Sequence, residues 1–211
     1  MIRVLLVDDH AVVRTGFRLL LQTHPEMTVV GEAASGEEAC RLYAELEPDV
    51  VLLDIAMPGM GGLEALKRIR ARDHRARVLA LSAHDDPMHA RRALREGALG
   101  FLSKRGAPET LIEAISSVAA GARFIDAEVA RKLALDELDG GGRSPLDRLS
   151  EREFDVFLRL ARGATVQRIA EELKLSASTV GTHLYNVKQK LGVVNQSELT
   201  LIAIRHGLID P

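Results

Sequence analysis

The sequence is poor in cysteine and contains no long apolar run. Cys40 is the only cysteine, which excludes an intramolecular disulfide and a zinc site built from several cysteines. No stretch approaches the roughly 20 apolar residues that a membrane-spanning helix needs. The first residues also lack the long apolar core and cleavage site of a signal peptide. We therefore expect a protein of the reducing cytoplasm with no part in the membrane.

Strong charge of either sign is also missing, since the formal net charge is −2. The 211 residues suffice for one large domain or two smaller ones with real cores. The segment 174–190 holds Lys174, Lys188 and Lys190 and no acidic residue. Such a weak basic patch suggests nucleic acid only where a motif supports it.

Residues 3–119 alternate between two kinds of pattern. Short apolar runs predict five strands, at 3–7, 27–33, 50–54, 77–82 and 99–103. Helical spacing after each run predicts helices at 10–21, from 35, and at 62–71, 87–96 and 108–119. Five βα units predict an α/β domain over residues 1–120, with a doubly wound parallel sheet and right-handed crossovers.

Polar residues follow the predicted strands at the point where each strand ends. They are Asp8 and Asp9, Asp54, Ser82, and Lys104. Ligands of such sheets bind beyond the carboxyl ends of the strands. Three neighbouring carboxylates need a cation, and oxygen ligands without an array of His or Cys suit Mg²⁺ or Mn²⁺.

Asp54 ends the apolar run Val50–Leu53, where a carboxylate can reach a cation or a ligand. Carboxylate, metal, lysine and hydroxyl together predict a phosphoryl acceptor. Taken singly, Asp8 or Asp9 also fits a helix cap, and Ser82 fits an ordinary loop hydroxyl. Their joint occurrence at four strand ends favours the acceptor site.

Residues 1–120 resemble the receiver domain of bacterial two-component response regulators. The matching residues are Asp8, Asp9, Asp54, Met57, Pro58, Gly59, Ser82, Phe101 and Lys104. The resemblance implies the flavodoxin-like strand order 2-1-3-4-5, and metal binding by the three aspartates and the backbone carbonyl of Ala56. It also implies that Asp54 accepts phosphate from a sensor histidine kinase. Ser82 and Phe101 would form the switch pair, and Lys104 would bind the phosphoryl group.

The family tunes dephosphorylation at the positions that are Ala56 and His84 in this chain. Neither side chain is an acid or amide suited to orienting an attacking water. We therefore expect a phosphoryl lifetime of minutes or longer, and loss of label within seconds would contradict it. An exposed loop position without this role is the alternative for His84.

Residues 121–147 break the βα pattern and predict a flexible linker with a short helix at 126–135. The triple glycine at 140–142 is typical of a hinge. Residues 148–211 show purely helical spacing, which predicts an all-α domain of four helices, at 150–162, 166–173, 176–191 and 196–206.

The helix predicted at 176–191 has two different faces. Its apolar face carries Val180, Leu184, Val187 and Leu191. Its opposite face has hydrogen-bonding groups with lysines at the margins, as suits a DNA major groove. The candidate DNA-binding residues are Ser178, Thr179, Thr182, Tyr185, Asn186, Lys188 and Lys190.

Residues 148–209 resemble the LuxR-type helix-turn-helix, through the strings at 149–153, 169–173, 175–180 and 190–193. With the receiver-like part, the chain is similar to response regulators of the NarL/FixJ class. This implies a transcription regulator that binds promoter DNA as a homodimer after phosphorylation. The family usually has lysine at the position of Gly181, so we expect modest affinity per monomer.

Two rival functions remain open at this point. Aspartyl-phosphate hydrolases of the haloacid dehalogenase type also use a carboxylate and Mg²⁺, but they need a second aspartate where this chain has Ala56. We therefore expect no enzymatic turnover beyond slow autodephosphorylation. The second rival is a phosphorylation-switched protein-binding adaptor whose helical domain only dimerises, an alternative that Gly181 leaves open.

Overall fold

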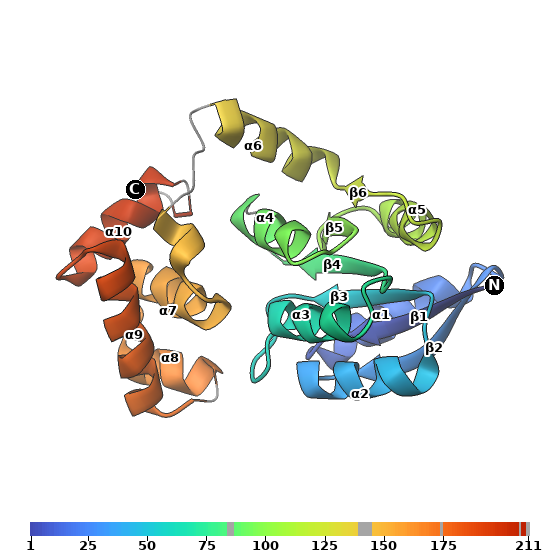
Figure 1. The fold of residues 1–211 in the computed structure, drawn as a ribbon, viewed down its shortest axis with the longest axis horizontal. Coiled ribbons are helices and arrows are strands. Elements are labelled where there is room, and N and C mark those ends of the chain that lie inside the picture. Colours follow the sequence, from blue (N-terminus) through green and yellow to red (C-terminus); the bar gives the residue numbers. More distant parts are fainter. Residues whose placement is uncertain (84–86, 139–144, 174, 207, 210–211) are drawn as a thin grey trace. The chain divides into compact units, whose positions relative to one another are not determined.

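The computed structural model describes the chain except residues 84–86, 139–144, 174, 207 and 210–211. The chain divides into two compact units, Met1–Gly140 and Gly141–Pro211. The first combines a sheet with surrounding helices, and the described part of the second is helical (Figure 1). No helix within the described residues is both long and apolar enough to cross a bilayer.

Six parallel strands form the sheet of the first unit, in the order β2-β1-β3-β4-β5-β6. The strands are β1 Ile2–Val7, β2 Met27–Ala33, β3 Val50–Asp54, β4 Val78–Ser82, β5 Gly100–Ser103 and β6 Phe124–Ile125. The five predicted strands and the doubly wound parallel sheet are confirmed. The short sixth strand was not predicted.

Helices cover both faces of this sheet. They are α1 Ala11–Gln22, α2 Gly36–Leu46, α3 Gly62–Arg72, α4 Pro87–Arg95, α5 Pro108–Ala119 and α6 Ala127–Leu138. Within β1, Val4 and Leu6 pack in the cluster of α1 and α5, whereas Leu5 and Val7 pack in the cluster of α2, α3, α4 and α6. Because successive strand residues point to opposite faces, burial on both sides requires a continuous apolar run.

The segment after α5 continues the first unit past the predicted boundary at residue 120. β6 pairs with β5, with Ile125 opposite Phe101. The Asp126 amide donates to the Phe101 carbonyl at 3.0 Å, and the Asp126 carboxylate accepts from the Glu128 amide at 3.0 Å, which caps α6. Val129 is fully buried in the same cluster as Phe101. The helix predicted at 126–135 is therefore present and packs on the sheet, while the glycines at 140–142 lie outside the described residues.

The second unit contains the four predicted helices after a short 3₁₀ turn. The elements are η1 Pro145–Arg148, α7 Glu151–Ala161, α8 Val166–Leu173, α9 Ala177–Leu191 and α10 Gln196–Arg205. The rings of Phe154 and Phe157 on α7 pack 5.9 Å apart in the core. Val180 and Val187 of α9 are fully buried, as its predicted apolar face requires. The Ser176 hydroxyl accepts from the Thr179 amide at 3.0 Å and starts α9 as an N-cap.

Candidate functional site

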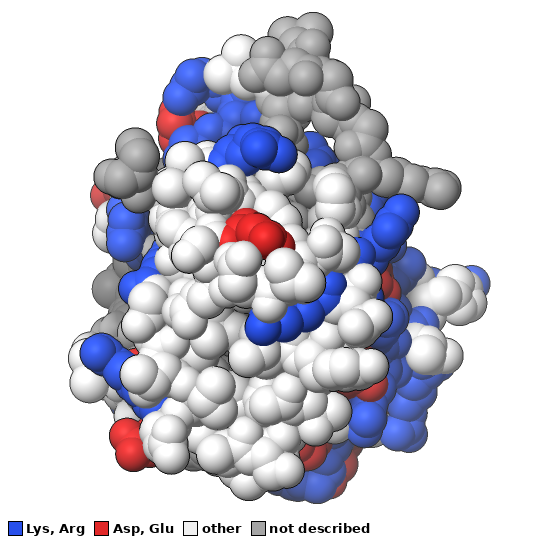
Figure 2. Space-filling view, turned by 90° about the vertical axis from the view of Figure 1, so that its left-hand side faces the viewer, with Lys and Arg blue, Asp and Glu red and all other residues white. Residues whose placement is uncertain are grey.

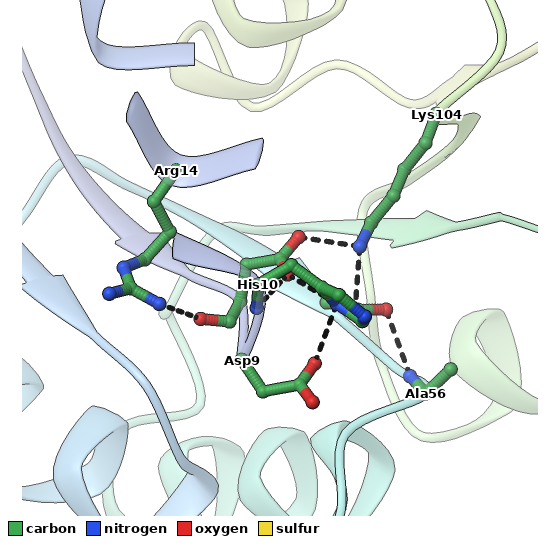
Figure 3. A network of polar contacts seen from close by, with 7 residues as sticks. Asp9, His10, Arg14, Ala56 and Lys104 are labelled. Atoms are coloured by element: carbon green, nitrogen blue, oxygen red, sulfur yellow. Dashed lines mark hydrogen bonds and ion pairs between the residues drawn. The ribbon is translucent and has the colours of Figure 1, made fainter. Parts of the chain in front are cut away.

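Three of the predicted site residues are in direct contact at the carboxyl edge of the sheet. Lys104, just beyond β5, places its Nζ 2.5 Å from Asp8 Oδ2 and 2.7 Å from Asp54 Oδ2 (Figure 3). Both carboxylates are only 2% exposed, and the lysine side chain is 11% exposed. The ammonium therefore bridges the ends of β1 and β3 inside a sheltered pocket.

The backbone around Asp54 fixes where its carboxylate points. Asp54 Oδ1 accepts a hydrogen bond from the Ala56 amide at 2.9 Å. Gly62 begins α3 directly against this turn. A Cβ at position 62 would collide with the Asp54 carbonyl and lie 2.6 Å from Ile55 Cα. The tight approach needs glycine, and it leaves Asp54 Oδ2 directed toward Lys104.

The electrostatics of the pocket favour an additional cation. Burial raises the pKa of the Asp54 carboxyl, and the Lys104 ammonium and the Ala56 amide oppose this rise without cancelling it. Burial by itself would lower the pKa of Lys104, but the Asp54 and Asp8 carboxylates outweigh burial and raise that pKa. The single Lys104 ammonium thus faces two buried carboxylates, Asp8 and Asp54, and a third acid, Asp9, directly follows Asp8 in the chain.

The donor atoms fit a divalent cation. Asp8, Asp9, His10 and Asp54 each offer one ligand atom, and these atoms all lie within 4.8 Å of one another. Asp9 Oδ1 is sheltered from solvent and accepts no hydrogen bond from the residues described. An orphaned carboxylate oxygen in such a cluster is suited to a metal. His10 was not predicted, although its place directly after the acidic pair was a signal.

Ser82 lies on β4 and Phe101 on β5, the two strands that follow β3 on the side away from β1. Asp54 pairs with Leu81 in the β3–β4 register, and Ser82 pairs with Ser103 in the β4–β5 register. Ser82 and Phe101 are both fully buried. The Ser82 carbonyl accepts from the Lys104 amide at 2.8 Å, which ties the predicted hydroxyl and lysine positions together. The roles in switching, and the Ala56 carbonyl as a metal ligand, stay predictions, and His84 lies outside the described residues.

Arg14 of α1 supports the acidic pair and was also not predicted. Its Nη1 donates to the Asp8 backbone carbonyl at 2.6 Å (Figure 3). Its Nε lies 3.4 Å from Glu32 Oε2 on β2. The Arg14 guanidinium therefore binds the backbone carbonyl of Asp8, while the Lys104 ammonium binds the Asp8 carboxylate. The helical spacing of α1 gave no sign of this, because position 14 lies off its apolar stripe.

The candidate DNA-binding residues of α9 share an exposed face of the second unit. Ser178, Thr179, Thr182 and Tyr185 are exposed, with Tyr185 64% exposed. The Thr182 hydroxyl bonds to the Ser178 carbonyl at 3.1 Å, so its methyl group is the part left for a partner. The surface seen from the side of α9 and α10 is mostly uncharged, with scattered basic and acidic side chains (Figure 2).

The two lysines at the end of α9 have partners inside the second unit. Lys190 Nζ lies 2.5 Å from Glu153 Oε2, the acid that completes the capping box of α7. Lys188 Nζ donates to the Val194 carbonyl at 2.9 Å. Both ammoniums therefore stabilise the packing of the domain, and a DNA phosphate would compete with these contacts.

Comparison with known families matches both units of the chain. Residues 4–116 match the response regulator receiver domain, and residues 147–203 match the bacterial regulatory proteins of the luxR family. Response regulator GacA of Pseudomonas aeruginosa is 40% identical over 211 residues, covering 100% of this chain and 99% of GacA. Response regulator UvrY of Escherichia coli is 41% identical, covering 100% of this chain and 97% of UvrY.

The chain is a two-component response regulator of the NarL/FixJ family. Solved structures resemble the regulator in its fold as well. RcsB of Salmonella enterica serovar Typhimurium, bound to promoter rprA with the phosphomimetic BeF₃⁻, has a TM-score of 0.64 at 27% identity, covering 95% of the regulator and 97% of RcsB. ChrA, from a haem-sensing two-component system, has a TM-score of 0.55 at 34% identity, covering 99% of the regulator and 98% of ChrA.

Gly181 sits within the regulator's α9 between the exposed Ser178 and Thr182. A Cβ at this position would meet nothing within 4 Å, so no packing requirement demands glycine. The residue therefore leaves an open place on the face that carries the candidate DNA contacts.

Proposed function

We propose that this regulator accepts a phosphoryl group on Asp54 from a sensor histidine kinase in the cytoplasm, dimerises, and then binds promoter DNA through α9. In this proposal the chain is not an enzyme, since it takes up one phosphoryl group and releases it slowly. The fold and the family support the regulatory class, and the residues at the sheet edge support the acceptor.

The observation that carries the proposal is the Lys104 ammonium bridging Asp8 and Asp54 at 2.5 and 2.7 Å. Asp54 Oδ2 would bond to phosphorus while the bond between phosphorus and the kinase histidine breaks. Lys104 would then move from the carboxylate to a phosphoryl oxygen, and the Ser82 hydroxyl would donate to another. Asp8, Asp9 and Asp54 would hold Mg²⁺ or Mn²⁺, which neutralises phosphoryl charge during in-line transfer.

Phosphorylation adds about −1.5 to −2 charges at Asp54. We propose that the resulting rearrangement of Ser82 and Phe101 changes the face formed by α4, β5 and α6, because Phe101 and Val129 share one buried cluster. The RcsB structures include two dimers bound to two parallel DNAs. They support DNA binding by dimers as the output of this regulator.

Asp54→Asn tests the acceptor. We expect wild-type protein to take up ³²P from labelled acetyl phosphate with Mg²⁺ and to shift genomic DNA fragments more strongly after that treatment. Asp54→Asn should take up no label and show no gain in binding, while its circular dichroism stays unchanged.

Asp49→Asn is the matched control, because Asp49 directly precedes β3 at the end opposite Asp54 and its carboxylate accepts from the Arg3 amide. It should be labelled like wild type. Labelling of Asp54→Asn to the wild-type level would refute the acceptor. Normal labelling with no shift of any fragment would instead favour the protein-binding adaptor.

A further inference from the structure

His10 directs a ring nitrogen into the acidic pocket that the proposed acceptor site contains. Its Nδ1 lies 3.0 Å from Asp9 Oδ1 and 3.3 Å from Asp8 Oδ1, and its amide donates to Asp8 Oδ1 at 2.8 Å (Figure 3). The His10 side chain is 65% exposed, so no packing contact forces the ring into this orientation. The two carboxylates are the polar groups that Nδ1 contacts among the residues described.

The contact between His10 and Asp9 leaves Asp9 Oδ1 without a hydrogen bond, whereas His10 Nδ1 is also in hydrogen-bond contact with Asp8 Oδ1 at 3.3 Å. Asp9 Oδ1 is 3.0 Å from Nδ1, yet it accepts no hydrogen bond with proper geometry. His10 Nδ1 and Asp9 Oδ1 belong to the four ligand atoms that lie within 4.8 Å of one another, so a cation held between them would give Asp9 Oδ1 a partner. Lys104 does not supply that cation, because its Nζ is bound to Asp8 Oδ2 and Asp54 Oδ2.

We propose that His10 Nδ1 is a ligand of the divalent cation in this pocket, alongside carboxylate oxygens, and that the site consequently prefers a first-row transition metal such as Mn²⁺ over Mg²⁺. Imidazole suits transition metals, whereas Mg²⁺ selects carboxylate, carbonyl and water oxygens. The oxygen-only site predicted from the sequence thus becomes a mixed nitrogen and oxygen site. The inference deepens the proposed acceptor site and rests on the cation that site needs.

The test compares metal affinities of the full-length protein without any phosphodonor. Mn²⁺ binding is titrated by electron paramagnetic resonance, and Mg²⁺ affinity is obtained by competition against bound Mn²⁺. We expect His10→Asn to weaken Mn²⁺ binding about tenfold and Mg²⁺ binding by less than about threefold. Electron spin echo spectroscopy of bound Mn²⁺ should show ¹⁴N coupling in the wild type that His10→Asn removes.

The asparagine variant keeps an N–H donor and an oxygen near the carboxylates, so it separates ligation from hydrogen bonding. If His10 only braced Asp8 and Asp9, the ratio of the two affinities would be the same in His10→Asn as in the wild type and no ¹⁴N coupling would be seen, which would overturn the inference. His74→Asn is the control, because His74 is an exposed histidine in the turn before β4, at the end of that strand opposite the carboxyl ends that form the pocket. It should leave both affinities unchanged.

Failure of this inference is distinguishable from failure of the acceptor. Asp54→Asn should weaken Mn²⁺ and Mg²⁺ alike, since it removes a shared oxygen ligand. If His10→Asn lost Mn²⁺ and Mg²⁺ affinity by the same factor and was labelled normally with phosphate, His10 would not be a metal ligand. The phosphoacceptor role of Asp54 would be unaffected by that result.

Discussion

Gly181 interrupts α9 at an open position between Ser178 and Thr182. We expect Gly181→Lys to raise DNA affinity for two separable reasons. Removing a mid-helix glycine stabilises the helix by up to about 1 kcal/mol. A new phosphate contact also steepens the dependence of log K on log salt by about 0.9. Binding isotherms at several salt concentrations measure both effects.

Gly181→Ala is the matched control, because it restores helix propensity and adds no charge. It should raise the thermal stability of the second unit and leave the salt slope unchanged. An identical salt slope for Gly181→Lys and wild type would show that position 181 does not reach a phosphate.

Individual residues of the acceptor pocket were predictable where chain order decided their place. Asp8, Asp54 and Lys104 follow buried parallel strands, and such strand ends must meet at one edge. His10 was not predictable as a contact of the pair, because its ring direction depends on side-chain rotation. The partners of Lys190 were equally hidden, since Glu153 approaches from another helix.

At the scale of elements, β6 and the docking of α6 are the features of the first unit that sequence periodicity did not predict. β6 has two residues, too few for any periodic pattern, and it is held through Phe101 and Ile125 pairing. The existence of α6 was predictable from the sequence, but its docking was not, because the helix mixes apolar with charged residues and that mixture does not single out Val129 as the fully buried side chain. Docking depends on the surface that β5 and α4 provide.

Val129→Ala tests whether α6 is part of the receiver unit. Removing methyl groups from this fully buried side chain should lower the free energy of unfolding of the first unit by about 1.5–3 kcal/mol. Amide hydrogen exchange of α6 should accelerate in parallel. Leu135→Ala on the same helix is the control, since Leu135 is 47% exposed and should change neither quantity by much. Equal behaviour of the two variants would mean that α6 is not docked in solution.

Glu153 links α7 to α9 and makes the second unit sensitive to acid. Burial by itself would raise the pKa of Glu153, but hydrogen bonds from Lys190 and Ser150 outweigh burial and hold that pKa below its ordinary value of 4.5. A lowered pKa means that the stabilisation is present above about pH 4.5 and is lost as the pH falls through the lowered value. We expect Glu153→Gln to cost about 1–2 kcal/mol at pH 7 and progressively less in acid.

Hydrogen exchange of α7 and α9 amides, compared between wild type and Glu153→Gln at each pH, measures that difference. Glu171→Gln, at an exposed acid on α8, should match wild type throughout. A stability difference that is constant from pH 7 to pH 3 would show that ionisation of Glu153 is not the cause.

At the scale of the whole molecule, the two units differ in how their patterns repeat. Alternating strands and helices extend through the first unit, whereas the second follows the helical period alone. Both architectures were predictable because periodicity is local to each element. The first compact unit extends beyond the receiver-like residues to Gly140 because α6 packs against β5 and α4, a tertiary contact with no local signature.

A dimeric regulator carrying one α9 per chain should recognise two half-sites about 10 bp apart, because a two-fold dimer meets the same groove once per helical turn. We expect the protein treated with acetyl phosphate to protect two such half-sites in a DNA footprint. Inserting 5 bp between them places the half-sites on opposite faces of the duplex and should weaken binding about 100-fold, since the second contact is then lost. Asp54→Asn should bind the original and the 5-bp-spaced DNA equally weakly, because it does not dimerise on treatment. Protection of a single unrepeated half-site by a phosphorylated monomer would contradict the dimer and place the whole affinity on one copy of α9.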